Sequence, residues 1–268
     1  MRLGALLVLS ALAAIASAQP VPTDAYPKAA AAYLVAVDGR VIWERAADVP
    51  RAPASLTKIM TALVLIDHGF DPGAVVSISR RAAAIGGAQL GLRAGQKMTA
   101  GDLFTAMLVR SANDACTALA EHGAGTVEAF VARMNERAAR IGLSATHFAN
   151  PCGLDAPRHQ SSARDLFHLT EVALTLPLFT RTVSLTRARV RVLGGPVFSL
   201  DSSNALLGRV PGVFGVKTGF TGAAGNSVIA AADRGGTRVI AVLLDSPDRW
   251  WAAAALVEKA FETAGAPR

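Results

Sequence analysis

Two β-hairpins are predicted at opposite ends of the chain, and the sequence between them is mainly helical. Near the start, the strand-like run AAAYLVAVDGRVIWERAAD turns at Asp38-Gly39, and near the end NSVIAAADRGGTRVIAVLLDS turns at Gly235-Gly236. A helical segment follows from about Asp248 to Ala264, and residues 55–180 are mainly helical in pattern. Strands from both ends therefore predict an α+β fold: one antiparallel sheet with covering helices and a helical lobe beside it.

The first twenty residues, MRLGALLVLSALAAIASAQP, carry one cation and a short apolar run that ends in small residues. This pattern predicts a signal peptide over residues 1–18, because the run is too short to span a bilayer comfortably. Residues 19–268 are then expected to form a single two-lobed catalytic domain. Since no later run approaches 18 apolar residues, we expect no membrane anchor and an exported, periplasmic or extracytoplasmic protein that is soluble after cleavage.

The net charge of +7 is spread along the chain, and no nucleic-acid-binding motif accompanies it. The segment RARVRV places Arg187, Arg189 and Arg191 on one face of a strand, which we interpret as a solvated face. No nucleic-acid partner is therefore expected.

The two cysteines, Cys116 and Cys152, are compatible with a disulfide in an oxidising compartment or with two buried thiols, and the sequence leaves both open. The five histidines form no metal-ligand spacing with one another or with a cysteine. We expect neither a metal nor a cofactor.

Three short motifs carry the candidate chemistry. In RAPASLTKIM, Ser55 and Lys58 are three residues apart on one helix face, close enough for the amine to reach the hydroxyl. One interpretation makes Ser55 a helix cap and lets Lys58 extend to water, and the other makes them a nucleophile and its base. In RSAND, Ser111 and Asn113 fall between two helices, where they also suit capping.

The third motif, Lys217-Thr218-Gly219, ends a strand-like run. A glycine there lets a substrate backbone approach closely, although a lysine on an exposed edge strand is an equally simple interpretation. The chain has five lysines, however, and two of them lie in these motifs.

Taken in order, S-x-x-K, S-x-N and K-T-G match the active-site motifs of class A β-lactamases and penicillin-binding proteins. From about Tyr33 to Ala260 the chain resembles the serine-type D-alanyl-D-alanine carboxypeptidases, which are low-molecular-mass penicillin-binding proteins. The stretches PASLTKIMTALV, RSANDACTALAEH, HFANPCGLDAPRHQSSARDL and NALLGRVPGVFGVKTGFTGAAG carry this resemblance. It implies a β-lactamase/transpeptidase-like fold.

The resemblance also implies catalytic roles. Ser55 would be the acyl-forming nucleophile, Lys58 its general base, and Ser111 a proton relay toward the leaving amine. The implied substrate-binding residues are Asn113 for a peptide amide, Lys217 for charge balance, Thr218 for the terminal carboxylate, and Gly219 and Phe220 on the same strand. The backbone N–H groups of Ser55 and Phe220 would form the oxyanion hole.

The implied activity removes the terminal D-alanine from peptidoglycan stem pentapeptides, with β-lactam antibiotics as covalent inhibitors. A D,D-endopeptidase acting on cross-links and a β-lactamase on the same fold stay open as alternatives, whereas a non-enzymatic wall-binding protein is disfavoured because every motif position is intact.

The chain also departs from relatives that carry an arginine or threonine before the asparagine equivalent to Asn204 or a histidine after K-T-G, since it has Ser203 and Phe220. Carboxylate anchoring is therefore left open. His159 matches a family position, but we expect it to be a surface residue at a helix entry.

Overall fold

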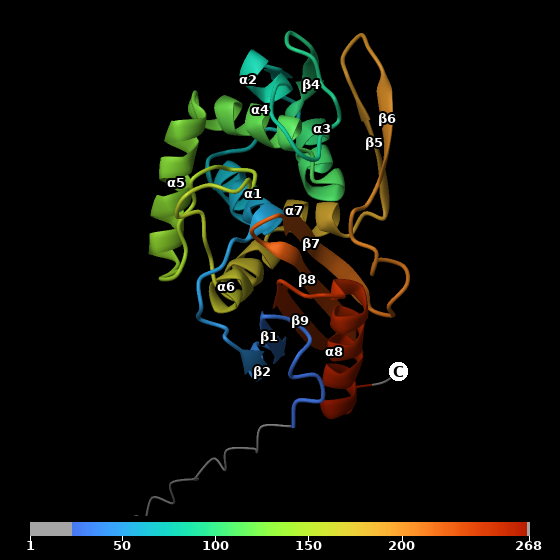
Figure 1. The fold of residues 1–268 in the computed structure, drawn as a ribbon. Helices are drawn as coiled ribbons and strands as arrows, with labels where there is room; N and C mark the ends of the chain where they lie inside the picture. The colour runs from blue at the N-terminus through green and yellow to red at the C-terminus, as the bar shows by residue number, and fades with distance from the viewer. Residues whose placement is uncertain (1–22, 267–268) are drawn as a thin grey trace, which may run out of the picture.

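A five-stranded antiparallel sheet forms the lower part of the molecule (Figure 1). The computed structural model describes residues 23–266, so the predicted signal peptide lies outside the described residues. The strand order is β2-β1-β9-β8-β7. The strands are β1 (Ala32–Val37), β2 (Arg40–Arg45), β7 (Val213–Thr221), β8 (Gly225–Arg234) and β9 (Thr237–Leu244).

Pairing between β1 and β9 joins the two ends of the chain, with Ala32 opposite Leu244. Both predicted hairpins are present: β1 and β2 meet at the Asp38-Gly39 turn, and β8 and β9 meet at Gly235-Gly236. The predicted α+β fold, with a sheet assembled from both chain ends, is therefore confirmed.

Successive residues of the interior strand β8 are buried on opposite faces of the sheet. Val228 and Ala230 pack with helix α8 (Arg249–Thr263), while Ile229 and Ala231 pack on the other face, which helix α6 (Ala163–Leu174) covers. Because both faces are covered, these strands read as nearly continuous apolar runs.

The middle of the chain forms the helical part above the sheet (Figure 1). Helix α1 (Lys58–Asp67) is buried along most of its length, and α5 (Val127–Arg140) shows one apolar face with Val127 and Phe130 inward. The remaining helices are the 3₁₀ turn η1 (Ala54–Thr57), α1 (Lys58–Asp67), α2 (Arg80–Ala83), α3 (Ala100–Thr105), the π-helical turn η2 (Ala106–Arg110), α4 (Asn113–Ala124), α5 (Val127–Arg140) and α7 (Pro177–Val183).

Two small antiparallel pairs accompany these helices. Strands β3 (Val75–Ser77) and β4 (Lys97–Thr99) were not expected, because three residues are too few to show an alternating pattern. Strands β5 (Arg187–Arg191) and β6 (Val197–Asp201) form a hairpin whose three β5 arginines are exposed, as the solvated-face interpretation predicts.

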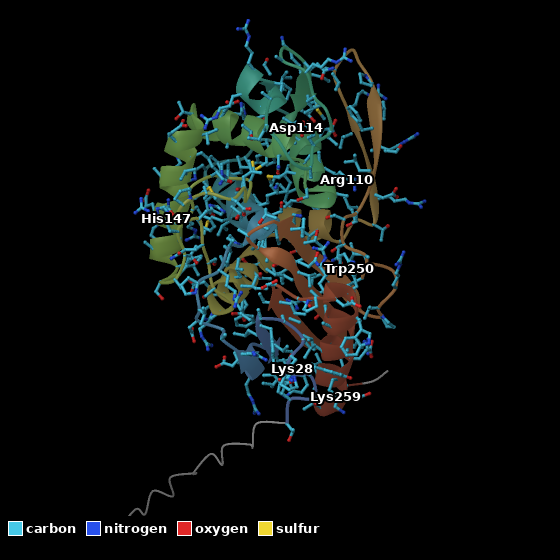
Figure 2. All side chains as sticks on the ribbon, in the orientation of Figure 1. Lys28, Arg110, Asp114, His147, Trp250 and Lys259 are labelled. Atoms are coloured by element: carbon cyan, nitrogen blue, oxygen red, sulfur yellow. The ribbon has the colours of Figure 1, made fainter. Side chains whose placement is uncertain are left out.

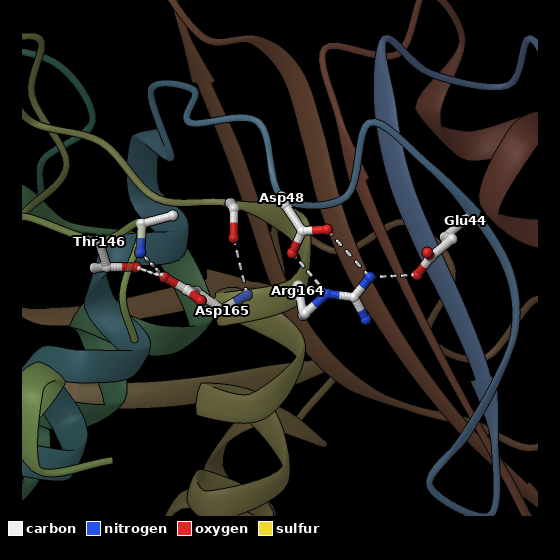
Figure 3. A network of polar contacts seen from close by, with 7 residues as sticks. Glu44, Asp48, Thr146, Arg164 and Asp165 are labelled. Atoms are coloured by element: carbon white, nitrogen blue, oxygen red, sulfur yellow. Dashed lines mark hydrogen bonds and ion pairs between the residues drawn. The ribbon is translucent and has the colours of Figure 1, made fainter. Parts of the chain in front are cut away.

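The start of α6 is fixed by the polar network in Figure 3. Ser162 caps the helix by accepting a hydrogen bond from the backbone N–H of Asp165. The Asp165 carboxylate accepts from the Thr146 hydroxyl, and Arg164 forms ion pairs with Asp48 and Glu44. The network ties α6 to the segment that leads from β2 toward Ser55.

Between residues 23 and 266, no helix combines the length and the apolar character that a membrane crossing requires. The assignment of residues 19–268 to a single domain stays a prediction.

Candidate active site

Ser55 lies in the 3₁₀ turn η1, which continues directly into α1 at Lys58. Ser55 is half-buried, whereas the Lys58 side chain is fully buried at 0 % exposure. The Lys58 Nζ lies 2.9 Å from the Ser55 Oγ. The interpretation in which Lys58 extends to water is therefore wrong, and the spacing brings the amine to the hydroxyl.

Two carbonyl oxygens complete the surroundings of the Lys58 amine. It donates to the side-chain Oδ1 of Asn113 at 2.7 Å and to the backbone oxygen of Cys152 at 2.6 Å. A neutral amine has two N–H donors and one lone pair. In the neutral form of the amine, the two carbonyls would accept its two N–H groups and the lone pair would face the Ser55 hydroxyl.

Asn113 begins α4 and also holds the loop above it. Its side-chain amide donates to the Gly86 oxygen at 2.7 Å, and its backbone N–H donates to the Ala88 oxygen at 2.7 Å. The next residue, Asp114, lies in the first turn of α4, in the upper helical part of the molecule (Figure 2); it is fully buried and accepts from backbone N–H groups. The donors are those of Leu90, Gly91, Leu92 and Ala115.

No local sequence pattern points to this role of Asp114, because three of its four donors, Leu90, Gly91 and Leu92, lie more than 20 positions earlier. These hydrogen bonds make Asp114 the anchor of the loop that borders Asn113.

Lys217 lies on β7 and is 1 % exposed, so it is not the exposed edge lysine of the simpler interpretation. Its Nζ donates to the Ser111 Oγ at 3.0 Å and to the Thr218 backbone oxygen at 3.0 Å. Burial, followed by the nearby cations Lys58 and Arg249, holds the pKa of Lys217 well below its usual range. Ser111 has a left-handed backbone (φ 65°) directly after η2, which directs its side chain toward β7.

Gly219 brings β7 against the turn that carries Ser55. A Cβ at this glycine would lie 2.9 Å from the Ala54 Cβ and 3.1 Å from the Ser55 backbone nitrogen, so a side chain there would displace the nucleophile turn. Phe220 follows and is 64 % exposed. One residue earlier, the Thr218 hydroxyl donates to the Ser203 hydroxyl at 2.9 Å.

Sequence reasoning missed the support given by Arg249, the first residue of α8. Its guanidinium is half-buried, lies 4.5 Å from the Trp250 ring, and donates to the Gly219 oxygen at 2.6 Å. An arginine at a helix start carries no local signal of a contact with a strand thirty residues earlier. Burial lowers the pKa of Arg249.

Asp155, the acidic residue in the loop after α5, is also held in place. It accepts from the Thr221 hydroxyl at 2.6 Å and from the Ala223 backbone N–H at 3.2 Å. These bonds tie the loop to the turn between β7 and β8.

The two cysteines are free thiols, and both are buried. The Cys116 thiol donates at 3.3 Å to the backbone oxygen of Pro151, the residue before Cys152. Of the two possibilities that the sequence left open, the structure contains the buried thiols. His159 is 5 % exposed, so its expected place on the surface is wrong. The cause is the packing of its loop against η1, which no local pattern reveals.

The predicted residues therefore gather in two hydrogen-bonded groups. One joins Ser55, Lys58 and Asn113, and the other joins Ser111, Lys217 and Thr218. Gly219 contacts the turn of the first group from the strand of the second, and Phe220 follows it. Among the described residues, no cluster of histidine, cysteine, aspartate or glutamate has the composition of a metal site.

Comparison with known proteins identifies the family of this chain. The family model for D-alanyl-D-alanine carboxypeptidases of peptidase group S11 matches residues 17–248. The chain belongs to the S11 family. The S11 match includes all three motifs, so the resemblance read from the sequence is confirmed.

Among curated S11 relatives, the D-alanyl-D-alanine carboxypeptidase DacF of Bacillus subtilis is 37 % identical over 210 residues, which cover 76 % of this chain and 54 % of the relative. DacB2 of Mycobacterium tuberculosis is 32 % identical over 92 % of this chain and 87 % of its own length. The chain thus spans about half the length of the Bacillus protein and most of the mycobacterial one.

Solved structures show the same fold. The D-alanyl-D-alanine carboxypeptidase from Mycobacterium tuberculosis has a TM-score of 0.82 at 31 % identity, covering 92 % of this chain and 95 % of that one. The Streptomyces K15 DD-transpeptidase has a TM-score of 0.82 at 29 % identity, covering 91 % and 100 %. The expected transpeptidase-like architecture is therefore confirmed.

Proposed function

We propose that this S11 protein removes the terminal D-alanine from peptidoglycan stem pentapeptides through an acyl-enzyme on Ser55. The observation that carries the proposal is the set of three contacts around the Lys58 amine, two to carbonyl oxygens and one to the Ser55 hydroxyl. In this arrangement both N–H groups of a neutral Lys58 are bonded to carbonyl oxygens. Its lone pair then faces the Ser55 hydroxyl and can accept the proton of that hydroxyl. Lysine then does the work that histidine does in other serine hydrolases.

Acylation begins when the Ser55 Oγ attacks the carbonyl carbon of the penultimate D-alanine and its proton passes to the Lys58 Nζ. The backbone N–H groups of Ser55 and Phe220 stabilise the oxyanion. The proton taken up by Lys58 then passes to the leaving nitrogen through the Ser111 hydroxyl, which is held by a hydrogen bond from Lys217, and Lys58 is again neutral. The C–N bond breaks, D-alanine leaves, and water later hydrolyses the ester to release the shortened peptide.

Asn113 and Lys217 complete the binding of the substrate in this proposal. Asn113 contacts a peptide amide, and its bonds with Lys58 and Gly86 hold its side chain in a fixed orientation for this contact. Lys217 places a buried amine beside the carboxylate site, where it donates to Ser111 and to the Thr218 backbone oxygen. Because stem peptides lie outside the cytoplasm, the proposal agrees with the signal peptide predicted over residues 1–18.

The terminal carboxylate is anchored by the hydroxyl pair of Thr218 and Ser203. The two oxygens are 2.9 Å apart, and each hydroxyl can rotate to donate to one carboxylate oxygen. Lys217 is bonded to Thr218 itself, and the charge comes from Arg249, bonded to Gly219. A serine thus serves at the position where some relatives carry an arginine.

Replacing Ser203 with alanine should raise KM about tenfold for a peptide that ends in a free carboxylate, which is the order of one hydrogen bond to a charged group. kcat should change little, because the bond is made in ground and transition states alike. Steady-state kinetics on the acid and on its C-terminal amide would measure this, with exposed Ser199→Ala as the control. An equal effect on acid and amide would contradict the anchor.

β-Lactams should acylate Ser55 and leave slowly. In the penicilloyl ester the leaving amine stays tethered and obstructs the approach of water, and class A β-lactamases overcome this with a glutamate that positions a water. Asp155, the acidic residue of the corresponding loop, is already bonded to Thr221 and Ala223. Intact-protein mass spectra after one dose of benzylpenicillin should keep the adduct mass for hours. Rapid return to the unmodified mass with continued drug consumption would favour a β-lactamase.

The proposed function is tested directly by incubating the purified protein with a pentapeptide that ends in D-Ala-D-Ala and, separately, with a cross-linked muropeptide. Mass spectrometry should show one D-alanine released from the pentapeptide. Faster cleavage of the cross-link would make the protein an endopeptidase, and release from neither substrate would defeat the proposal.

A further inference from the structure

The loop between α5 and α6, over residues 148–161, forms a wall against the nucleophile turn η1. Its Cys152 oxygen accepts the hydrogen bond from Lys58 at 2.6 Å. Gly153 comes so close that a Cβ there would lie 1.8 Å from the Ala54 oxygen, and its φ of +87° also favours glycine. The position of this loop therefore determines the position of the turn.

His159 links the loop to the turn from inside. The His159 ring is buried beside Phe148, with ring centroids 5.9 Å apart. The Ala149 backbone N–H donates to the His159 Nδ1 at 2.9 Å, and the His159 Nε2 lies 2.9 Å from the Thr57 Oγ1. Because a backbone N–H only donates, Nδ1 must be the bare nitrogen, and a neutral ring carries its proton on Nε2. His159 therefore donates to Thr57.

We infer that His159 is a positioning residue for acylation, which holds Thr57 and thereby sets the backbone between Ser55 and Lys58. Thr57 is fully buried and directly precedes Lys58, so a shift of Thr57 moves the amine relative to the hydroxyl. Both nitrogens of the His159 ring are already engaged, which leaves neither free to take a proton from a water. The inference rests on the proposed function.

The neutral ring is required for this contact. Protonation would place a second N–H at Nδ1, facing the N–H of Ala149. Burial, together with the neighbouring His147 and Lys58, lowers the pKa of His159 to about 4, against a raising effect of Asp155. The folded-state pKa is lower than the ordinary value near 6.5, so the stabilisation is complete above that value and is lost as the pH falls toward about 4.

The test compares acylation by a fluorescent penicillin in four variants and one control variant of the full chain. His159→Leu should slow acylation by about 10- to 100-fold, the cost of a misplacement of roughly 1 Å. His159→Gln should stay within about threefold of the wild type, because its amide still donates to Thr57. Thr57→Val should slow acylation as much as His159→Leu does. The double variant that combines Thr57→Val with His159→Leu should be no slower than either single variant, since each change removes the same Thr57–His159 contact. Exposed His168→Gln is the matched control.

Two further readouts separate positioning from a general loss of stability. The ratio of wild-type to His159→Gln acylation rates should be constant above about pH 5 and fall toward pH 4. The pH dependence that comes from ionisable groups present in both proteins cancels in this ratio. Nitrogen-15 NMR of the wild type should show His159 as the Nε2–H tautomer without protonation near pH 6.5.

The inference is overturned by an Nδ1–H tautomer, by titration near pH 6.5, by additive losses in the double variant, or by wild-type acylation in His159→Leu. If His159→Leu does not fold, Thr57→Val and the NMR spectrum of the wild type decide. A wild type that penicillin never labels would instead defeat the proposed function.

Discussion

Replacing Ser55 with alanine is expected to abolish both covalent labelling by a fluorescent penicillin and release of D-alanine. The alanine side chain has no oxygen to form the ester, and within residues 23–266 no other hydroxyl lies within hydrogen-bonding distance of the Lys58 amine. Gel fluorescence and intact mass would detect labelling, and a D-alanine assay would detect turnover.

The matched control for this change is Ser77→Ala, an exposed serine on β3 that should label like the wild type. The thermal midpoint of Ser55→Ala should stay close to that of the wild type, because the half-buried hydroxyl makes one side-chain contact in the turn. A labelled Ser55→Ala protein would place the nucleophile elsewhere.

Replacing Lys58 with alanine is expected to slow acylation by about 10²- to 10⁴-fold, the usual contribution of a general base. Ser55 would keep its hydroxyl but lose the group that takes its proton. The change also leaves the Asn113 and Cys152 oxygens without their donor, so the thermal midpoint should fall as well. Stopped-flow acylation and circular dichroism would separate the two effects.

Two comparisons make the Lys58 result specific. Lys58→Arg keeps nitrogen donors at this position but stays protonated, so it has no lone pair to take the Ser55 proton and should acylate as poorly as Lys58→Ala. Exposed Lys97→Ala removes one cation from β4 and should leave acylation unchanged. Near-normal acylation in either Lys58 variant would mean that another group is the base.

The sheet and the motif residues were predictable because their signals are local. Asp38-Gly39 and Gly235-Gly236 each lie between strand-like runs, and the three-residue spacing of Ser55 and Lys58 brings their side chains together on any helix. The pairing of β1 with β9 followed from strands at both ends that needed a common sheet.

The supporting contacts were not predictable, since each joins residues far apart in the chain. Arg249 reaches Gly219, Asp155 reaches Thr221, and His159 reaches Thr57 across 102 positions. No periodicity or spacing encodes such a pair. Each side chain also has an ordinary interpretation on the surface, which is why His159 was expected there.

Strand β7 ends the sheet on the side of the nucleophile turn, and among the described residues it has a strand partner on one side only. A strand edge of this kind pairs with any extended chain that reaches it, and proteins commonly blunt such edges with charge or proline. Here the segment from Thr218 to Thr221 carries neither, and Phe220 within it is 64 % exposed. The same open edge that would receive a peptide in the proposed function can therefore also pair with a second copy of the protein. We therefore expect a peptide or inhibitor bound along the edge of β7 to reduce self-association at high protein concentration.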